Sequence, residues 1–177
     1  KVVGRVILWL AGATPLVSHR ERIEEFRPAI YVSNHVSTLD TFVAIWICPI
    51  GGCGVAKKEI LRIPFFGWLY FLSGHLVIDR SDRSSAIAAM RDTAEFVKQN
   101  KLSIWIWPEG TRSRDGRLHK GHTGVARLAL RTGCPIVPTG VQGSLEVQPP
   151  DAKVPNVFRK VRVRFGRPID VTRYLDR

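Results

Sequence analysis

The chain has 177 residues, 45% of them hydrophobic, which excludes an intrinsically disordered protein and predicts a single domain spanning residues 1–177. Lysine and arginine number 27 against 15 acidic residues, giving a net charge of +12. This charge favours an anionic partner without specifying it: nucleic acid, an anionic bilayer, a phosphorylated ligand or an acidic carrier protein.

The N-terminal segment from Val2 to Val17 is mostly apolar, with Trp9 near its middle and Arg5 interrupting it. It lacks the small-residue cleavage site of a signal peptide, and it is shorter than the ~20 residues that span a bilayer. Two interpretations of a helix at residues 1–18 stay open: it lies in a membrane interface, or it packs in the core. The first residue is lysine rather than methionine, which leaves room for an anchor segment upstream.

An apolar strand at 29–33 leads through a polar loop into a helix at 39–47, and a short strand follows at 53–56. The stretch 63–72 is the most aromatic of the chain and comes directly after several cations. Such a stretch is typical of a bilayer surface, but it is equally compatible with packing in the core or with the wall of an acyl tunnel. The remaining pattern predicts strands at 75–78, 101–107, 135–141 and 161–165, helices at 84–99 and 123–132, and a polar loop at 142–155.

Strands that alternate with helices predict an α/β fold with a mixed, largely parallel central sheet flanked by helices. In such sheets ligands bind beyond the carboxyl ends of the strands. The unusual polar residues of this chain follow the predicted strands: His35, Lys57, Arg80, Glu109 and Arg112. We therefore expect these side chains to converge on one rim of the sheet.

His35 and Asp40 form the pair with the clearest chemical meaning. Histidine can take a proton near neutral pH, and a carboxylate fixes its tautomer and stabilises the imidazolium. The alternative is structural, because Ser37 to Asp40 also fits a capping box at the start of the next helix. The two interpretations are compatible, since a carboxylate in the first helical turn can reach back to the loop.

The cations predicted at the same rim indicate a phosphate site. Glu109 is expected either to accept a hydrogen bond from a ligand hydroxyl or to hold Arg112, and Gly110 lets the backbone approach a ligand. A surface turn with an ion pair is the alternative for this segment. A base beside a phosphate site suits a reaction in which the hydroxyl of a phosphorylated acceptor attacks an electrophile.

Several catalytic classes lack their motifs here. The sequence contains no GxSxG, no P-loop, no GxGxxG and no cluster with metal-ligand spacing. Cys48, Cys53 and Cys134 are odd in number and have no CxxC spacing, which indicates reduced thiols in a cytosol-facing protein. The sequence thus predicts direct transfer without a metal or a covalent enzyme intermediate.

Four segments, in chain order, resemble the motif blocks of the glycerolipid acyltransferases. They are Asn34-His35 with Asp40, Gly74 to Arg80, Pro108 to Ser113, and Ile136 to Pro138. Further likeness lies in Ala56 to Glu59, in Ile63 to Gly67 and in Val163 to Ile169. The ordered set, over residues 30–169, is specific. Two features depart from the family: His75 stands where a small or apolar residue is usual, and the N-terminal segment is short for the two-helix membrane motif of bacterial members.

Within the family the likeness is greatest to the enzymes that acylate 1-acylglycerol-3-phosphate. It implies a glycerol-phosphate acyltransferase-like fold with a catalytic core at 29–170 and a membrane-associated helix at 1–18. It also implies that His35, oriented by Asp40, deprotonates the acceptor hydroxyl, which then attacks the thioester of acyl-CoA or acyl carrier protein. The residues implied in acceptor binding, with Arg112 on the phosphate, are Lys57, Arg80, Glu109, Gly110, Thr111 and Arg112.

The resemblance implies acylation of a lysophospholipid to phosphatidic acid at the cytoplasmic face of a cell membrane, with an anionic membrane surface as partner. No metal and no cofactor beyond the acyl thioester is expected. Another lysolipid acceptor, such as lyso-ornithine lipid or a glycolipid, stays open. A nucleic-acid-binding domain is the alternative from a different class, but only the basicity supports it and no nucleic-acid motif is present, so no nucleic acid partner is expected.

Overall fold

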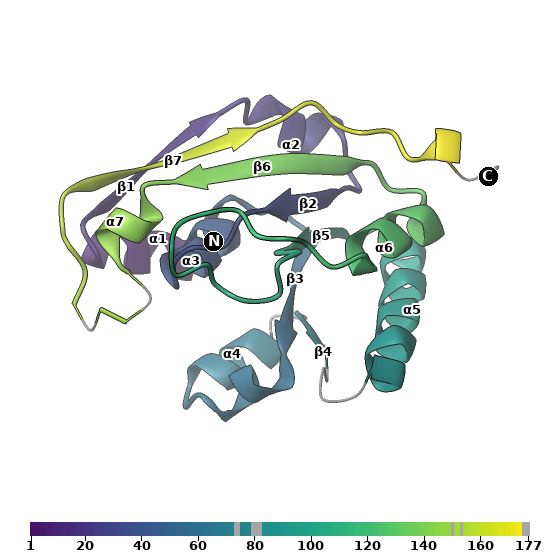
Figure 1. Cartoon of the computed structure of the whole chain (residues 1–177), viewed down its shortest axis with the longest axis horizontal. Helices are drawn as coiled ribbons and strands as arrows, with labels where there is room; N and C mark the ends of the chain where they lie inside the picture. Colours follow the sequence, from purple (N-terminus) through teal and green to yellow (C-terminus); the bar gives the residue numbers. More distant parts are fainter. Residues whose placement is uncertain (73–74, 79–82, 150, 153, 175–177) are drawn as a thin grey trace.

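The structure is a computed structural model that describes residues 1–72, 75–78, 83–149, 151–152 and 154–174. Its strands, in chain order, are β1 (Ala13–Ser18), β2 (Ile30–Ser33), β3 (Gly52–Lys57), β4 (Leu76–Ile78), β5 (Ser103–Ile106), β6 (Ile136–Gln142) and β7 (Arg159–Phe165). Within the described residues they form one sheet in the order β1-β7-β6-β2-β5-β3-β4 (Figure 1). Its helices are α1 (Val2–Leu10), α2 (Glu21–Glu25), α3 (Leu39–Ile47), η1 (Lys58–Arg62), α4 (Phe66–Leu72), α5 (Arg83–Gln99), α6 (Gly124–Thr132), α7 (Ser144–Val147) and η2 (Thr172–Tyr174).

The sheet is mixed and largely parallel, as the sequence predicts. β2 pairs in parallel with both β5 and β6, β5 pairs in parallel with β3, and β3 with β4. The antiparallel pair is β6 with β7, and β7 pairs in parallel with β1. Because β2, β3, β5 and β6 run in one direction, the loops that leave them meet at the same rim.

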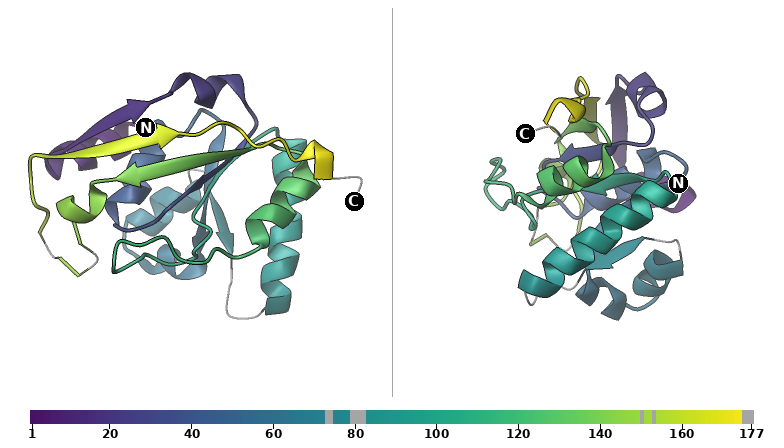
Figure 2. Two further views of the ribbon diagram at one scale, coloured as in Figure 1. Left: turned by 45° about the horizontal axis from the view of Figure 1, so that its top comes forward. Right: turned by 90° about the vertical axis from the view of Figure 1, so that its right-hand side faces the viewer.

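Two hydrophobic clusters cover the two faces of the sheet. Tyr31 and Trp105 point into the cluster that contains α1 and α3, whereas their neighbours Ile30 and Ile104 point into the cluster under α5 and α6. Figure 2 shows α5 crossing the molecule on the second side. The central strands are buried on both faces, which explains why their sequences are nearly continuous apolar runs.

α1 packs closely on α3. A Cβ atom at Gly4 would lie 2.6 Å from the carbonyl oxygen of Phe42, so glycine is what permits this approach of the two backbones. Leu8 completes the contact from the next turn and is almost fully buried. The inner face of α1 is therefore a core face, while its other residues point to solvent.

The prediction of a helix over residues 1–18 is wrong beyond Leu10. The helix ends there, and Ala13–Ser18 is an edge strand parallel to β7. Gly12 has a φ of +61° and lies against Val157, and Pro15 disfavours helix in the residue before it, so the chain turns out of the helix. In the described ranges, no helix combines the length and the apolar character needed to cross a bilayer.

Smaller differences occur in two other segments. The predicted polar loop at 142–155 contains the short helix α7, which begins after Gly143 in a left-handed conformation. The charged segment before β2 contains the short helix α2. The other predicted elements are present, with boundaries that differ by a few residues.

Candidate active site

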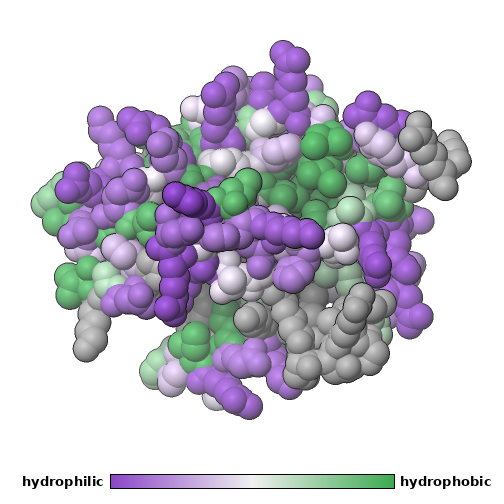
Figure 3. Space-filling model, in the orientation of Figure 1, coloured by the Kyte–Doolittle hydropathy of each residue, from purple (hydrophilic) through white to green (hydrophobic). Residues whose placement is uncertain are grey.

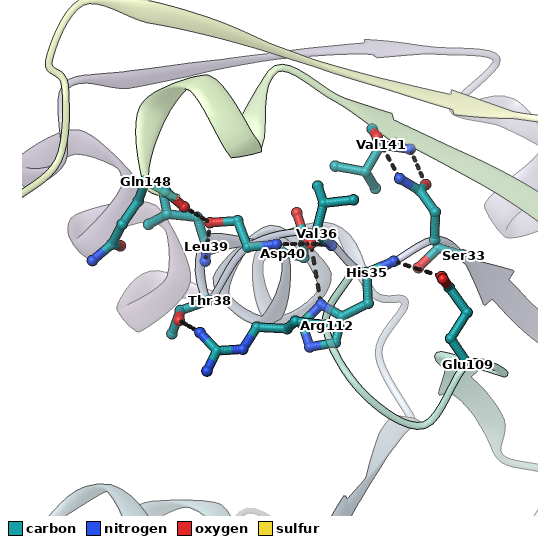
Figure 4. A network of polar contacts seen from close by, with 12 residues as sticks. Ser33, His35, Val36, Thr38, Leu39, Asp40, Glu109, Arg112, Val141 and Gln148 are labelled. Carbon is teal, nitrogen blue, oxygen red and sulfur yellow. Dashed lines mark hydrogen bonds and ion pairs between the residues drawn. The ribbon is translucent and has the colours of Figure 1, made fainter. Parts of the chain in front are cut away.

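The loop after β2 is fixed to the neighbouring strand by Asn34. Its side-chain Nδ2 donates to the carbonyl oxygen of Val141 at 2.8 Å, and its Oδ1 accepts from the backbone N–H of the same residue at 2.8 Å (Figure 4). The side chain thus replaces a strand partner for β6 where β2 has ended. The next residue, His35, is thereby held at the rim of the sheet.

His35 and Asp40 are hydrogen-bonded, with 3.1 Å between Nδ1 of the imidazole and Oδ2 of the carboxylate. Asp40 is fully buried, and the same Oδ2 accepts from the backbone N–H groups of Val36 at 2.7 Å and Ser37 at 2.8 Å. These bonds fix the carboxylate and, through it, the ring. With Nδ1–H donating to Asp40, Nε2 is left as the acceptor.

The capping interpretation of the same residues is also satisfied. α3 begins at Leu39, whose N–H donates to the Ser37 hydroxyl at 3.2 Å, while Asp40 accepts from the Ser37 N–H. The Ser37 hydroxyl donates in turn to the carbonyl oxygen of Gln148 at 2.7 Å. One carboxylate therefore stabilises the start of α3 and orients His35, so the two interpretations describe a single arrangement.

Trp107 stacks on His35, with 4.6 Å between the ring centroids and 24° between the ring planes. The sequence analysis assigned this residue no role. A signal was available: Trp105 and Trp107 lie on the same face of an extended segment, so a residue just past the end of β5 continues the core face towards the rim. The indole face fixes the plane of the imidazole.

Glu109 connects the loop that follows β5 with the loop that follows β2. It is nearly fully buried; its Oε1 accepts from the backbone N–H of His35 at 3.3 Å, and its Oε2 from that of His119 at 2.9 Å. The backbone N–H of Ser113 donates to the carbonyl oxygen of His35 at 2.7 Å. The expected pairing of Glu109 with Arg112 is not present, because the guanidinium donates instead to the Thr38 hydroxyl at 2.6 Å.

A cavity of about 400 Å³ lies beside this rim. His35 and Arg112 both line it, together with Gly110 and Thr111, so the imidazole and the guanidinium share one cavity as the sequence predicts. Gly110 has a φ of +72°, a conformation in which a side chain would be strained. In the described part of the chain Arg112 forms no ion pair with a carboxylate.

The other predicted cations are only partly accounted for. Lys57 ends β3, which runs parallel to β5, so its backbone lies at the same rim. Its side chain and the whole of Arg80 lie outside the described residues. The structure therefore brings His35, Asp40, Gly110, Thr111 and Arg112 together, and places Glu109 directly behind them.

The lining of the same cavity also includes an aromatic pair, Tyr70 and His75. The rings of Tyr70 and His75 are 4.4 Å apart, and Nδ1 of His75 accepts from the Gly54 N–H at 2.9 Å. Burial lowers the pKa of His75, because the charged form of the ring loses its hydration. Burial also raises the pKa of Cys48, which lines the same cavity, to about 12, so this thiol is not ionised near neutral pH.

The site thus combines an imidazole–carboxylate pair at the rim of an α/β sheet with an arginine and a largely apolar cavity. The model of the acyltransferase family matches residues 15–142, more than half of the chain. The chain belongs to this family.

The relatives narrow the likeness further. The chain is 41% identical over 143 residues to a 1-acyl-sn-glycerol-3-phosphate acyltransferase of Limnanthes douglasii, covering 81% of this chain and 50% of the relative. It is 41% identical over 118 residues to the protein of that name from Escherichia coli, covering 67% and 48%. The crystal structure of the 1-acyl-sn-glycerophosphate acyltransferase PlsC of Thermotoga maritima superposes with a TM-score of 0.80 at 26% identity, covering 94% and 66%. The chain spans about half the length of the curated relatives it matches.

Proposed function

We propose that this chain transfers a fatty acyl group from an acyl thioester to the free hydroxyl of 1-acylglycerol-3-phosphate, which gives phosphatidic acid. The observation that carries the proposal is the position of His35, which is bonded to the buried carboxylate of Asp40 and shares a cavity with Arg112. The names of the relatives supply the substrate class.

In the proposed reaction Nε2 of His35 accepts the proton of the acceptor hydroxyl. At the same time the hydroxyl oxygen forms a bond to the carbonyl carbon of the thioester. The tetrahedral intermediate collapses with cleavage of the C–S bond. The departing thiolate takes the proton from the imidazolium, so that His35 is neutral again. The negative charge of Asp40 stabilises the imidazolium between these two proton transfers.

The phosphate of the acceptor binds to Arg112, whose guanidinium lines the cavity and donates at present to Thr38. A guanidinium makes forked hydrogen bonds to phosphate oxygens. Lys57, at the end of β3, and Arg80, which follows β4 in the sequence, add positive charge. The backbone of Gly110 and Thr111 borders the acceptor, while Glu109 holds the loop from behind rather than contacting the substrate.

The acyl donor is acyl-CoA or acyl carrier protein, and the reaction requires no metal or further cofactor, since the base, the nucleophile and the leaving group account for every proton and bond. The cytoplasmic face of a cell membrane is the proposed place of action. The outer face of α1 supports contact with an anionic bilayer: Trp9 is 75% exposed, and Val2, Val6 and Leu10 are exposed around it.

One assay tests the acceptor and the donor together. Purified protein is incubated with a labelled acyl group on CoA or on acyl carrier protein, and with a panel of lysolipids. We expect 1-acylglycerol-3-phosphate to be the preferred acceptor. Preference for lyso-ornithine lipid or a glycolipid would replace the acceptor but not the reaction, and salt-sensitive binding to DNA without any acyl transfer would refute the enzymatic assignment.

A further inference from the structure

The segment formed by η1 and α4 exposes aromatic side chains in a way that the core does not explain. Phe65 is 91% exposed and Trp68 is 76% exposed, and Phe71 and Leu72 on the same helix are also exposed. Burying these side chains in the core would stabilise the fold, yet they stay in contact with water. A contiguous apolar patch of this kind marks an interaction site. Trp68, Phe71 and Leu72 line, together with Leu61 and Gly67, a shallow apolar hollow of about 360 Å³.

This arrangement is built into the backbone. Phe65 has a φ of +60°, which is rare for a bulky side chain, and it lies at the turn between η1 and α4. A Cβ atom at Gly67 would lie 2.4 Å from the carbonyl oxygen of Leu61, so only glycine lets α4 fold back so tightly on η1. η1 and α4 are therefore one hairpin with a fixed apolar outer face.

Two observations favour an anionic bilayer as the occupant of this face. Exposed cations lie beside it on η1, Lys58 at its start and Arg62 at its end. Aromatic side chains flanked by cations are typical of the headgroup region of an anionic bilayer. α4 stands away from the central strands in Figure 1, and the space-filling view shows hydrophobic beside hydrophilic surface at the lower edge where the hairpin lies (Figure 3).

The same hairpin connects the apolar face with the candidate active site. Ile60 of η1 and Tyr70 of α4 line the cavity that contains His35. Leu69 and Tyr70 also line a second cavity, of about 230 Å³, whose other wall includes Val3 of α1. The hairpin thus contributes to the wall of the cavity that contains His35 and, together with α1, to the wall of a second cavity.

We propose that η1 and α4 dock the protein on an anionic bilayer, with Phe65, Trp68, Phe71 and Leu72 in the interface, and that a lipid enters the cavity beneath this hairpin. The second part rests on the proposed function, because it requires a lipid substrate. The first part does not. A second copy of this chain and an acidic carrier protein are the other conceivable occupants, and the test separates them.

Sedimentation with vesicles of phosphatidylcholine, with and without phosphatidylglycerol, measures docking. Trp68→Glu and Phe71→Glu are each expected to weaken binding about tenfold or more, because each removes the transfer of a large apolar side chain out of water. Phe96→Glu on α5 is the matched control, an exposed aromatic on another helix. Wild-type binding in both hairpin variants, or an equal loss in the control, would overturn the docking face.

A measurement on the unaltered protein avoids any effect of the substitutions on folding. Vesicles that contain a photoactivatable phospholipid are illuminated with the wild-type chain, and labelled peptides are mapped. We expect label within residues 61–72. Label confined to other segments would overturn the proposal, as would a dimer in lipid-free solution that Trp68→Glu dissociates while vesicle binding is kept. The proposal would also be overturned if Trp68→Glu lost binding to acyl carrier protein while its vesicle binding stayed unchanged.

Activity separates this proposal from the proposed function. With a short-chain acceptor dissolved as monomers, Trp68→Glu is expected to keep the wild-type kcat, whereas turnover of a long-chain acceptor in vesicles falls in step with binding. If the wild-type chain acylates no lysolipid but Trp68→Glu loses vesicle binding, the docking face stands and the function falls. If acylation of vesicle substrate is unchanged in Trp68→Glu, the docking face falls alone.

Discussion

Two regions of the molecule differ in which side chains they expose to water. They are the rim at the ends of β2 and β5, and the hairpin of η1 and α4. At the rim, the carboxylates of Asp40 and Glu109 are almost fully buried and each is bonded to backbone N–H groups. On the hairpin, Phe65 and Trp68 are 91% and 76% exposed. Both regions invert the usual distribution of polar and apolar residues. The inversion costs stability in each case, and it marks the two places where we propose that the protein meets its substrates.

The difference also concerns rigidity. The rim is held by side-chain bonds that span long stretches of sequence, such as Asn34 to Val141 and Glu109 to His35. The hairpin is held by local packing of α4 on η1 through Gly67. Proton transfer needs atoms placed to within a fraction of an ångström, whereas a bilayer tolerates many arrangements of an aromatic side chain. Substitutions at the rim and in the cavity test this difference one residue at a time.

The largest effect is expected for His35→Ala. Loss of the base should lower kcat by ~10²–10⁴-fold or more, because no other group takes the proton of the acceptor hydroxyl. Vesicle binding should stay close to that of the wild type, since His35 lies at the rim and not on the hairpin. Turnover at the wild-type rate in this variant would remove His35 from the mechanism.

Arg112→Ala should act mainly on the acceptor. The KM for the phosphorylated acceptor is expected to rise roughly 10–100-fold, which corresponds to the loss of a charge-assisted hydrogen bond, with a small effect on kcat. Arg112→Lys keeps the positive charge but not the forked pair of N–H donors, so its KM should lie between those of the wild type and Arg112→Ala. Steady-state kinetics with varied acceptor measure this, and an unchanged KM in Arg112→Ala would show that the phosphate binds elsewhere.

Glu109→Gln tests whether this residue braces the loops or binds substrate. The amide turns one N–H donor towards a backbone donor, so the free energy of unfolding should fall by about 1–3 kcal/mol. Displacement of His35 should lower kcat and leave the acceptor KM nearly unchanged. Urea denaturation and kinetics together decide the point: a raised KM at unchanged stability would make Glu109 a substrate ligand after all.

The smallest effect is expected from His75, which also lines the cavity. Its pKa is lowered by burial, so below its ordinary value of 6.5 the unfolded chain binds a proton that the folded chain does not. Stability should therefore fall as the pH drops below that value, and the fall should be smaller in His75→Asn. Urea denaturation at a series of pH values compares the two slopes. Equal slopes would show that the ring titrates normally in the folded protein.

Much of this arrangement follows from local sequence. Val32 to Asp40 contains a strand end, a loop and a helix start, each with its own signal, and the parallel pairing predicted that His35 and Arg112 would meet. The error at residues 13–18 arose because apolar residues in a short edge strand and in a helix look alike until Gly12 and Pro15 are weighed. The brace by Glu109 was not predictable, because its backbone partner His119 lies ten residues away in a loop without periodicity.

The position of β1 also bears on how the chain can be handled. β1 covers the outer edge of β7, where Arg159 to Phe165 would otherwise present unpaired backbone groups. Uncovered edges of this length recruit strands from other molecules. A shortened chain that starts after Ser18 would therefore gain a self-association site, so loss of solubility on trimming would report on sheet protection rather than on membrane attachment.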